Sequence, residues 1–236
     1  MNDLKTYRVC GWFALAFIVL ALGQFPLYTM GDASVSFYNG AAIAQDYARI
    51  HAIVFLRILL DIGLYIVSMV FAAAFSHLIK RARSEYGWVG TLVFGAMAVW
   101  LGVTLVANSM EGGIALDTLN GNADPSVART LTQGMLLIYN GSIAFGITGL
   151  FLGAAGYATF VTEILPKWTG WLAYAGAILC ALCIPAMFGG PADFRGFYNA
   201  GGWGPLIVAN FPDAIWFVAV GVYMIRVRGA PSDSDR

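Results

Sequence analysis

Two oppositely charged residues, Arg57 and Asp61, lie four positions apart inside a long stretch of otherwise apolar residues. A spacing of four places both side chains on the same face of an α-helix. An ionisable side chain inside a lipid bilayer costs several kcal/mol unless it is paired or hydrated, so it usually marks a functional site or a structural ion pair. The spacing therefore predicts either a binding or proton-carrying site, or a pair whose charges neutralise each other.

Polar residues also interrupt four other apolar stretches of the chain. In chain order these residues are Gln24, Asn108, Glu111, Asn140, Asn210 and Asp213. We expect Arg57, Asp61, Asn140 and Asp213 to meet in one half of a helix bundle, with Asn108, Glu111 and His51 at its mouth. Two carboxyl groups that share an apolar site do not both stay ionised at low cost, so one of them is able to carry a proton.

These expectations assign provisional roles. The expected ligand contacts are Arg57, Asn108, Asn140, Asn210 and His51. If the protein is an enzyme, the expected acid–base groups are Asp61, Asp213 and Glu111. As an anion or carbonyl contact, Arg57 would have Asp61 and Asp213 as its charge partners.

The sequence suggests no metal site and no cofactor. The two histidines, His51 and His77, are 26 residues apart on one expected helix, which is about 39 Å and too far to share a metal. Cys180 and Cys183 form a CxxC pair, but they lie late in an apolar stretch. A thioredoxin-type pair needs an exposed helix N-terminus, so we interpret these cysteines as apolar packing residues.

The composition is that of a membrane protein. Of 236 residues, 59% are hydrophobic and 11% are charged, and the mean hydropathy is +0.73, whereas a soluble domain carries roughly 25% charged residues. The expected fold is an all-α, polytopic bundle of six transmembrane helices in one domain, 1–228, followed by a short disordered tail, 229–236. The expected spans are 7–30, 49–78, 88–109, 131–162, 168–187 and 205–225. A net charge of zero, without a basic and aromatic run, argues against nucleic-acid binding.

The first apolar stretch follows two basic residues, Lys5 and Arg8, and so also fits a signal peptide. However, it continues through Tyr28, which is long enough to span a bilayer. We therefore expect it to be retained as the first helix.

Charges alternate between the connecting segments. Basic residues gather in the first ten residues, in the segment 80–83, at Lys167 and in the C-terminal tail, whereas the other connections are longer and acidic. By the positive-inside rule, both termini are expected to be cytoplasmic, in a bacterial inner membrane. The outer connection around Asp193 and Arg195 is rich in glycine and proline, and it fits a lid over the polar site and a plain turn equally well.

A row of glycines marks the fourth expected span. Gly146, Gly149, Gly153 and Gly156 recur at spacings of three and four, so they share one helix face. Small residues let a neighbouring helix approach closely in lipid, where packing drives association. We expect this face to pack either within the bundle or between two copies of the chain.

Two short motifs resemble those of an uncharacterised bacterial six-helix membrane family, one of the classes known as domains of unknown function. Arg57-x-x-x-Asp61 looks like that family's Arg-x-x-x-Asp helix, and Leu165-Pro166-Lys167-x-x-Gly170 looks like its Leu-Pro-basic-x-x-Gly turn before the fifth helix. The resemblance implies a six-helix fold and makes Arg57 and Asp61 family features. It assigns no activity.

Three functions remain open from the sequence. The first is a protein that binds or passes a small or amphipathic molecule in an outward-opening polar pocket. The second is an intramembrane acid–base enzyme, such as an isomerase or a cyclase, that acts on an apolar substrate. The third is a structural or accessory subunit, partnered by copies of itself or by other membrane proteins. A pocket lined by both Asp61 and Asp213 favours the first two, whereas polar side chains that pair off without a cavity favour the third.

Overall fold

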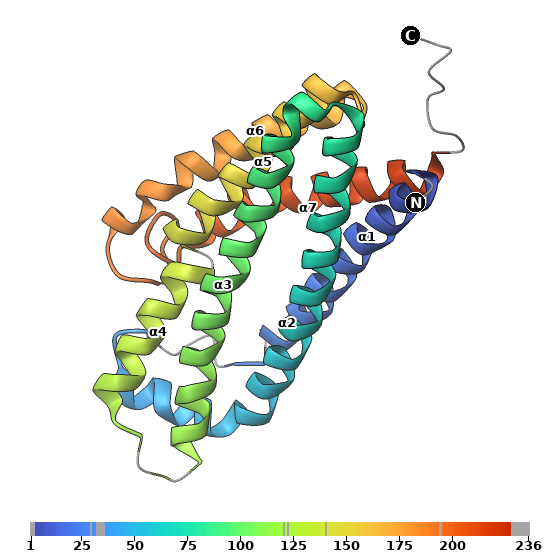
Figure 1. Ribbon diagram of the computed structural model, residues 1–236. Coiled ribbons are helices and arrows are strands. Elements are labelled where there is room, and N and C mark those ends of the chain that lie inside the picture. The colour runs from blue at the N-terminus through green and yellow to red at the C-terminus, as the bar shows by residue number, and fades with distance from the viewer. Residues whose placement is uncertain are drawn as a thin grey trace, which may run out of the picture.

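The computed structural model describes residues 3–28, 30–31, 36–119, 121, 123–139, 141–193 and 195–227. Every regular element in these ranges is helical, which confirms the all-α class. The α-helices, drawn in Figure 1, are α1 (Asp3–Tyr28), α2 (Gly40–Ala82), α3 (Gly87–Thr118), α4 (Pro125–Tyr139), α5 (Ser142–Thr162), α6 (Lys167–Cys183) and α7 (Trp203–Arg226). Two 3₁₀-helices, η1 (Ser84–Tyr86) and η2 (Ile184–Gly189), precede α3 and follow α6.

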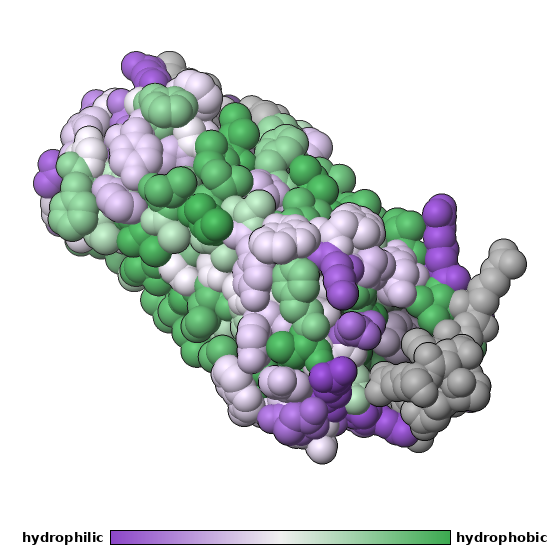
Figure 2. Space-filling view, turned by 90° about the horizontal axis from the view of Figure 1, so that it is seen from above, coloured by the Kyte–Doolittle hydropathy of each residue, from purple (hydrophilic) through white to green (hydrophobic). Residues whose placement is uncertain are grey.

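In the described part of the chain, six helical segments are long and apolar enough to cross a membrane. They are Leu4–Tyr28, Gly40–Ala82, Ser84–Thr118, Pro125–Thr162, Lys167–Gly189 and Trp203–Arg226. Figure 2 shows hydrophobic residues over much of the middle of the molecule, while hydrophilic side chains gather towards its ends. The six predicted spans, and with them a multi-pass membrane protein, are confirmed at this level.

Two helices are longer than predicted. α2 has 43 residues, about 64 Å, which exceeds the roughly 30 Å apolar core of a bilayer. It begins nine residues before the expected span, and α3 likewise continues to Thr118 instead of ending at residue 109. The extensions are held by a separate hydrophobic cluster that includes Ile43 and Tyr47 of α2, Ile114 of α3 and Ala128 of α4. Hydropathy alone did not indicate this packing outside the apolar zone.

The fourth predicted span is not one continuous helix, because α4 ends at Tyr139 and α5 begins at Ser142. Gly141 lies in the break, where a Cβ atom would be 2.5 Å from the carbonyl oxygen of Leu136. Only a residue without a side chain fits there. At its other end, α4 is capped by Asp124, and hydrogen bonds from the Ser126 hydroxyl and backbone hold the pKa of that carboxyl below its usual range.

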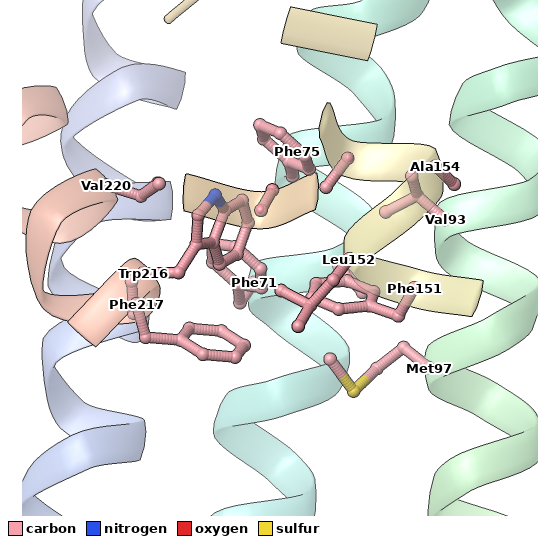
Figure 3. Packing of buried hydrophobic residues seen from close by; sticks show 14 of the residues in the cluster. Phe71, Phe75, Val93, Met97, Phe151, Leu152, Ala154, Trp216, Phe217 and Val220 are labelled. Carbon is pink, nitrogen blue, oxygen red and sulfur yellow. The ribbon is translucent and has the colours of Figure 1, made fainter. Parts of the chain in front are cut away.

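The main hydrophobic core lies where α2, α5 and α7 meet (Figure 3). The ring of Phe151 on α5 stacks on Phe217 at a centroid distance of 5.9 Å and meets Trp216 edge-on at 5.6 Å. Phe71 of α2 contacts the same three rings. This aromatic cluster joins helices that are far apart in the sequence and forms the floor beneath the polar residues described below.

The glycine-rich face of α5 packs within the chain, against α6. A Cβ atom on Gly149 would lie 3.3 Å from Cβ of Cys180, and one on Gly156 would lie 2.9 Å from the Tyr174 ring. α1 and α7 also approach closely, because a Cβ atom on Gly11 would lie 2.8 Å from the Gly221 carbonyl oxygen. Of the two arrangements expected for the glycine face, the structure has the one within the bundle.

The N-terminal end of α1 lies beside the α5–α6 turn, since the Tyr7 hydroxyl donates to the Ile164 carbonyl at 3.3 Å. The α2–α3 turn is at the same end, because the Tyr157 ring near the end of α5 contacts those of Tyr86 and Trp88. The ribbon in Figure 1 shows the N-terminus and the end of α7 close together there. An even number of spans therefore returns the chain to the side from which it started.

Candidate functional site

A cavity of about 520 Å³ lies in the half of the bundle away from the termini. Every α-helix except α6 contributes to its wall. The wall is mostly apolar and aromatic, with side chains such as Phe17 of α1, Trp100 of α3 and Phe151 of α5. Among the lining residues that the structure describes, the only charged side chains are Asp61 of α2 and Asp213 of α7.

Asp61 is buried and held by neighbours from two other helices. Its Oδ1 accepts a hydrogen bond from Nε2 of Gln24 on α1 at 2.5 Å. Its Oδ2 lies 3.5 Å from the hydroxyl of Tyr139, at the end of α4. Both partners also line the cavity, so polar side chains from α1 and α4 orient this carboxyl of α2.

Asn108 of α3 extends this network behind the cavity wall. Its Nδ2 donates to the hydroxyl of Tyr65 on α2, and its Oδ1 accepts from the hydroxyl of Tyr139. Only 4% of Asn108 is exposed, and it does not line the cavity. Asn108 therefore lies behind the cavity wall, with both ends of its amide bonded to tyrosines, and its role as a ligand contact stays a prediction.

Arg57 does not pair with Asp61. Its guanidinium forms an ion pair with Glu111 of α3 and lies over the Tyr28 ring, 4.5 Å from the centroid. Glu111 is 2% exposed and does not line the cavity, and its expected acid–base role stays a prediction. The long side chain of Arg57 reaches the carboxylate of Glu111 on the facing helix α3, and a guanidinium pairs strongly with a carboxylate. Arg57 likewise does not line the cavity, and its expected role as an anion contact stays a prediction.

Asp213 lies inside the bundle but is only half-buried, unlike Arg57, Asp61 and Glu111. Its Oδ1 is buried and has no hydrogen-bond partner among the described residues. Pro212, which precedes it, packs near Gly176 of α6 and removes one backbone donor from this turn of α7. One turn away, Asn210 also lines the cavity and donates from Nδ2 to the Leu206 carbonyl at 2.8 Å. In the cavity wall, the Asp61 carboxyl therefore has hydrogen-bond partners, whereas Oδ1 of Asp213 has none among the described residues.

Of the remaining expected contacts, His51 does not line the cavity. His51 is bonded locally, with Nδ1 2.9 Å from the Ala48 carbonyl oxygen and its ring against Phe55. Asn140 lies outside the described residues. Asp193 and Arg195 do not line the cavity. Asn199 instead bonds to the backbone of Asp193, because its Oδ1 accepts from the Asp193 N–H and its Nδ2 donates to the Asp193 carbonyl. The described residues of this segment are thus joined to one another by hydrogen bonds.

Gln24 and Tyr139 complete the site. Gln24 is one amide in an otherwise apolar stretch, a signal that the sequence does carry. Tyr139 could not be distinguished from the many aromatic residues of an apolar span, since its role depends on where the chain breaks after it. All three cysteines are buried and free.

No model of a known protein family matches this chain, and neither a curated protein nor a solved structure shows a significant similarity to it. The resemblance to the six-helix family therefore stays a prediction. Its two motif residues, Arg57 and Asp61, have separate partners in the structure. Function must be argued from the cavity itself.

Proposed function

We propose that this protein binds or passes a small amphipathic molecule in the cavity between α1, α2, α3, α4, α5 and α7. The observation that carries the proposal is one cavity of about 520 Å³ whose mainly apolar wall holds two carboxyl groups, Asp61 and Asp213. Ligand sites of roughly 300–1,000 Å³ are typically apolar with a few placed polar groups. Five buried side-chain nitrogen and oxygen atoms of the described residues have no hydrogen-bond partner, and Oδ1 of Asp213 is the one that belongs to a residue of the cavity wall.

Orientation follows from the charges at the two ends. Lys80, Arg81 and Lys167 lie at the end that also holds the termini, whereas Asp117 and Asp124 lie at the other. The positive-inside rule makes the first end cytoplasmic, so the cavity belongs to the outer half of a bacterial inner-membrane protein. Phe25 and Trp203 line the cavity and are both exposed at the surface, which supports an entrance at the surface of the bundle.

A second candidate is an intramembrane acid–base enzyme. It is favoured by the neighbouring carboxyl of Asp61 and hydroxyl of Tyr139, 3.5 Å apart in the cavity wall, which are two groups able to give or take a proton. Asp61 and Asp213 remain its acid–base candidates because both face the same cavity. We do not include Glu111 in this role, since its carboxylate pairs with Arg57 and does not line the cavity. The third candidate, a structural subunit, has no comparable support.

Native mass spectrometry of the protein extracted gently with its own lipids tests the proposal. We expect a specific small molecule or lipid to stay bound to the unchanged protein and to be lost from Asp213→Asn. Asp117→Asn is the matched control, because Asp117 is exposed on α3 and makes the same chemical change away from the cavity. A bare protein mass, or only other protein chains bound, would overturn the proposal in favour of a structural subunit.

A further inference from the structure

The charge inside the cavity has one sign. Asp61 and Asp213 line it, and no lysine, arginine or histidine does so within the described ranges. The nearest buried cation, Arg57, is compensated by Glu111 and covered by the Tyr28 ring. An anionic ligand would therefore meet two carboxyl groups and no positive side chain, which costs free energy in an apolar environment.

The two carboxyl groups differ in how many hydrogen-bond partners the protein gives them. Asp61 accepts a hydrogen bond from Gln24 and has the Tyr139 hydroxyl nearby. Oδ1 of Asp213 is buried without a partner among the described residues, and the amide of Asn210 is directed to a backbone carbonyl of its own helix. A buried carboxylate without a partner is stabilised most by a cation placed against it. Asp213 is therefore the place in the cavity where a positive group lowers the free energy most.

The rest of the wall suits the same kind of ligand. Six phenylalanine and tryptophan side chains line the cavity, namely Phe17, Phe25, Trp100, Phe151, Trp203 and Phe217. Aromatic faces attract cations, and their apolar area accommodates hydrocarbon. A small inorganic ion would gain little here, since it prefers several oxygen ligands and strong hydration.

We infer that the ligand is an amphipathic organic cation, with its positive group beside Asp213 and its apolar body against the aromatic wall. The inference rests on the proposed function and specifies its ligand class. A neutral alcohol can also donate a hydrogen bond to Asp213, but it leaves the charge of the carboxylate uncompensated and uses none of the aromatic attraction for cations.

Two probes of the same shape and opposite charge separate these cases. Tetraphenylphosphonium is a cation and tetraphenylborate an anion, and both have four phenyl rings around a central atom. Binding of each to the full-length protein in one detergent is measured by isothermal titration calorimetry. We expect the cation to bind at least about tenfold more tightly than the anion, because one sign of charge lines the cavity. This comparison uses the unchanged protein and so does not depend on the folding of any variant.

Three variants locate the effect. Asp213→Asn should remove most of the preference for the cation, Asp213→Glu should keep it, and Asp117→Asn should leave it unchanged. Equal affinities for the two probes in the unchanged protein, or a preference that survives in Asp213→Asn, would overturn the cation assignment.

The proposed function is judged separately, with Ala214→Phe, which fills the cavity next to Asp213. If both probes bind equally and both are lost in Ala214→Phe, the cavity is a ligand site and only the cation assignment is overturned. If neither probe binds, the cation assignment is overturned, and a bare mass in the native spectrum overturns the proposed function as well.

Discussion

Arg57 of α2 forms its ion pair with Glu111 of α3, 54 positions along the chain, and not with Asp61 one helical turn away on its own helix. This pairing divides the charges inside the bundle into two sets. Arg57 and Glu111 neutralise each other behind the cavity, while Asp61 and Asp213 are left as the charges of the cavity wall. The division decides which variants should affect stability and which should affect binding.

The Arg57–Glu111 pair should be structural. Glu111→Ala strands a buried guanidinium, and we expect the free energy of unfolding to fall by about 3–5 kcal/mol. The double change Arg57→Met with Glu111→Leu removes both charges and should be milder than Glu111→Ala alone. Unfolding in detergent, followed by circular dichroism, measures both variants. Asp61→Asn is the control, since it leaves the pair intact. A double variant as unstable as the single one would contradict the assignment.

Asn108 should hold three helices together through its two tyrosine partners. Asn108→Leu leaves the hydroxyls of Tyr65 and Tyr139 without their shared amide, so we expect a loss of about 1–3 kcal/mol. Its neighbour Ser109 bonds only to its own helix in the described contacts, and Ser109→Ala serves as the control. Equal stability of the two variants would show that the amide bridge contributes nothing.

The glycine face of α5 should be needed for packing against α6. Gly149→Leu with Gly153→Leu places bulk against Ala177 and Cys180, and we expect about 1–3 kcal/mol of destabilisation for each forced contact. The matched control is Gly95→Leu with Gly102→Leu on α3, where nothing lies within 4 Å of an added Cβ. Thermal unfolding compares the pairs. If the α5 pair is as stable as the α3 pair, the close approach of α5 and α6 is not required.

The orientation can be checked with single cysteines, because Cys10, Cys180 and Cys183 are buried and should react slowly. A cysteine at Ala123, before α4, should be labelled from outside intact cells by a membrane-impermeant maleimide. A cysteine at Glu85, in the α2–α3 turn, should be protected until the membrane is opened. The reverse labelling pattern would show that the protein has the opposite orientation, with the cavity in the cytoplasmic half of the membrane.

The sequence predicted the number of spans because a stretch of about 20 consecutive apolar residues is typical of a transmembrane helix. It did not predict how far α2 and α3 extend, since their ends are held by contacts between Tyr47, Ile114 and other residues outside the apolar zone. The break between α4 and α5 also went unpredicted. It depends on the lack of space for a side chain at Gly141, which hydropathy does not report.

The candidate site was predicted in its residue types and only partly in its contacts. Asp61, Asp213 and Asn210 line one cavity, as their similar depth in the second and sixth spans suggested. The spacing of residues in the sequence could not predict their hydrogen-bond and ion-pair partners, because these partners lie on facing helices and the tertiary fold determines which helices face each other. Arg57 therefore had Asp61 as its nearest carboxylate in the sequence and Glu111 in space.

The most direct test of the account is an electron cryomicroscopy structure of the protein purified with its own lipids. We expect density that is not protein in the cavity, with its polar end next to the carboxyl of Asp213 and its body along Phe17 and Phe217. A cavity that is closed by repacked side chains, with Asp213 bonded to another residue of the chain, would contradict a ligand-binding function.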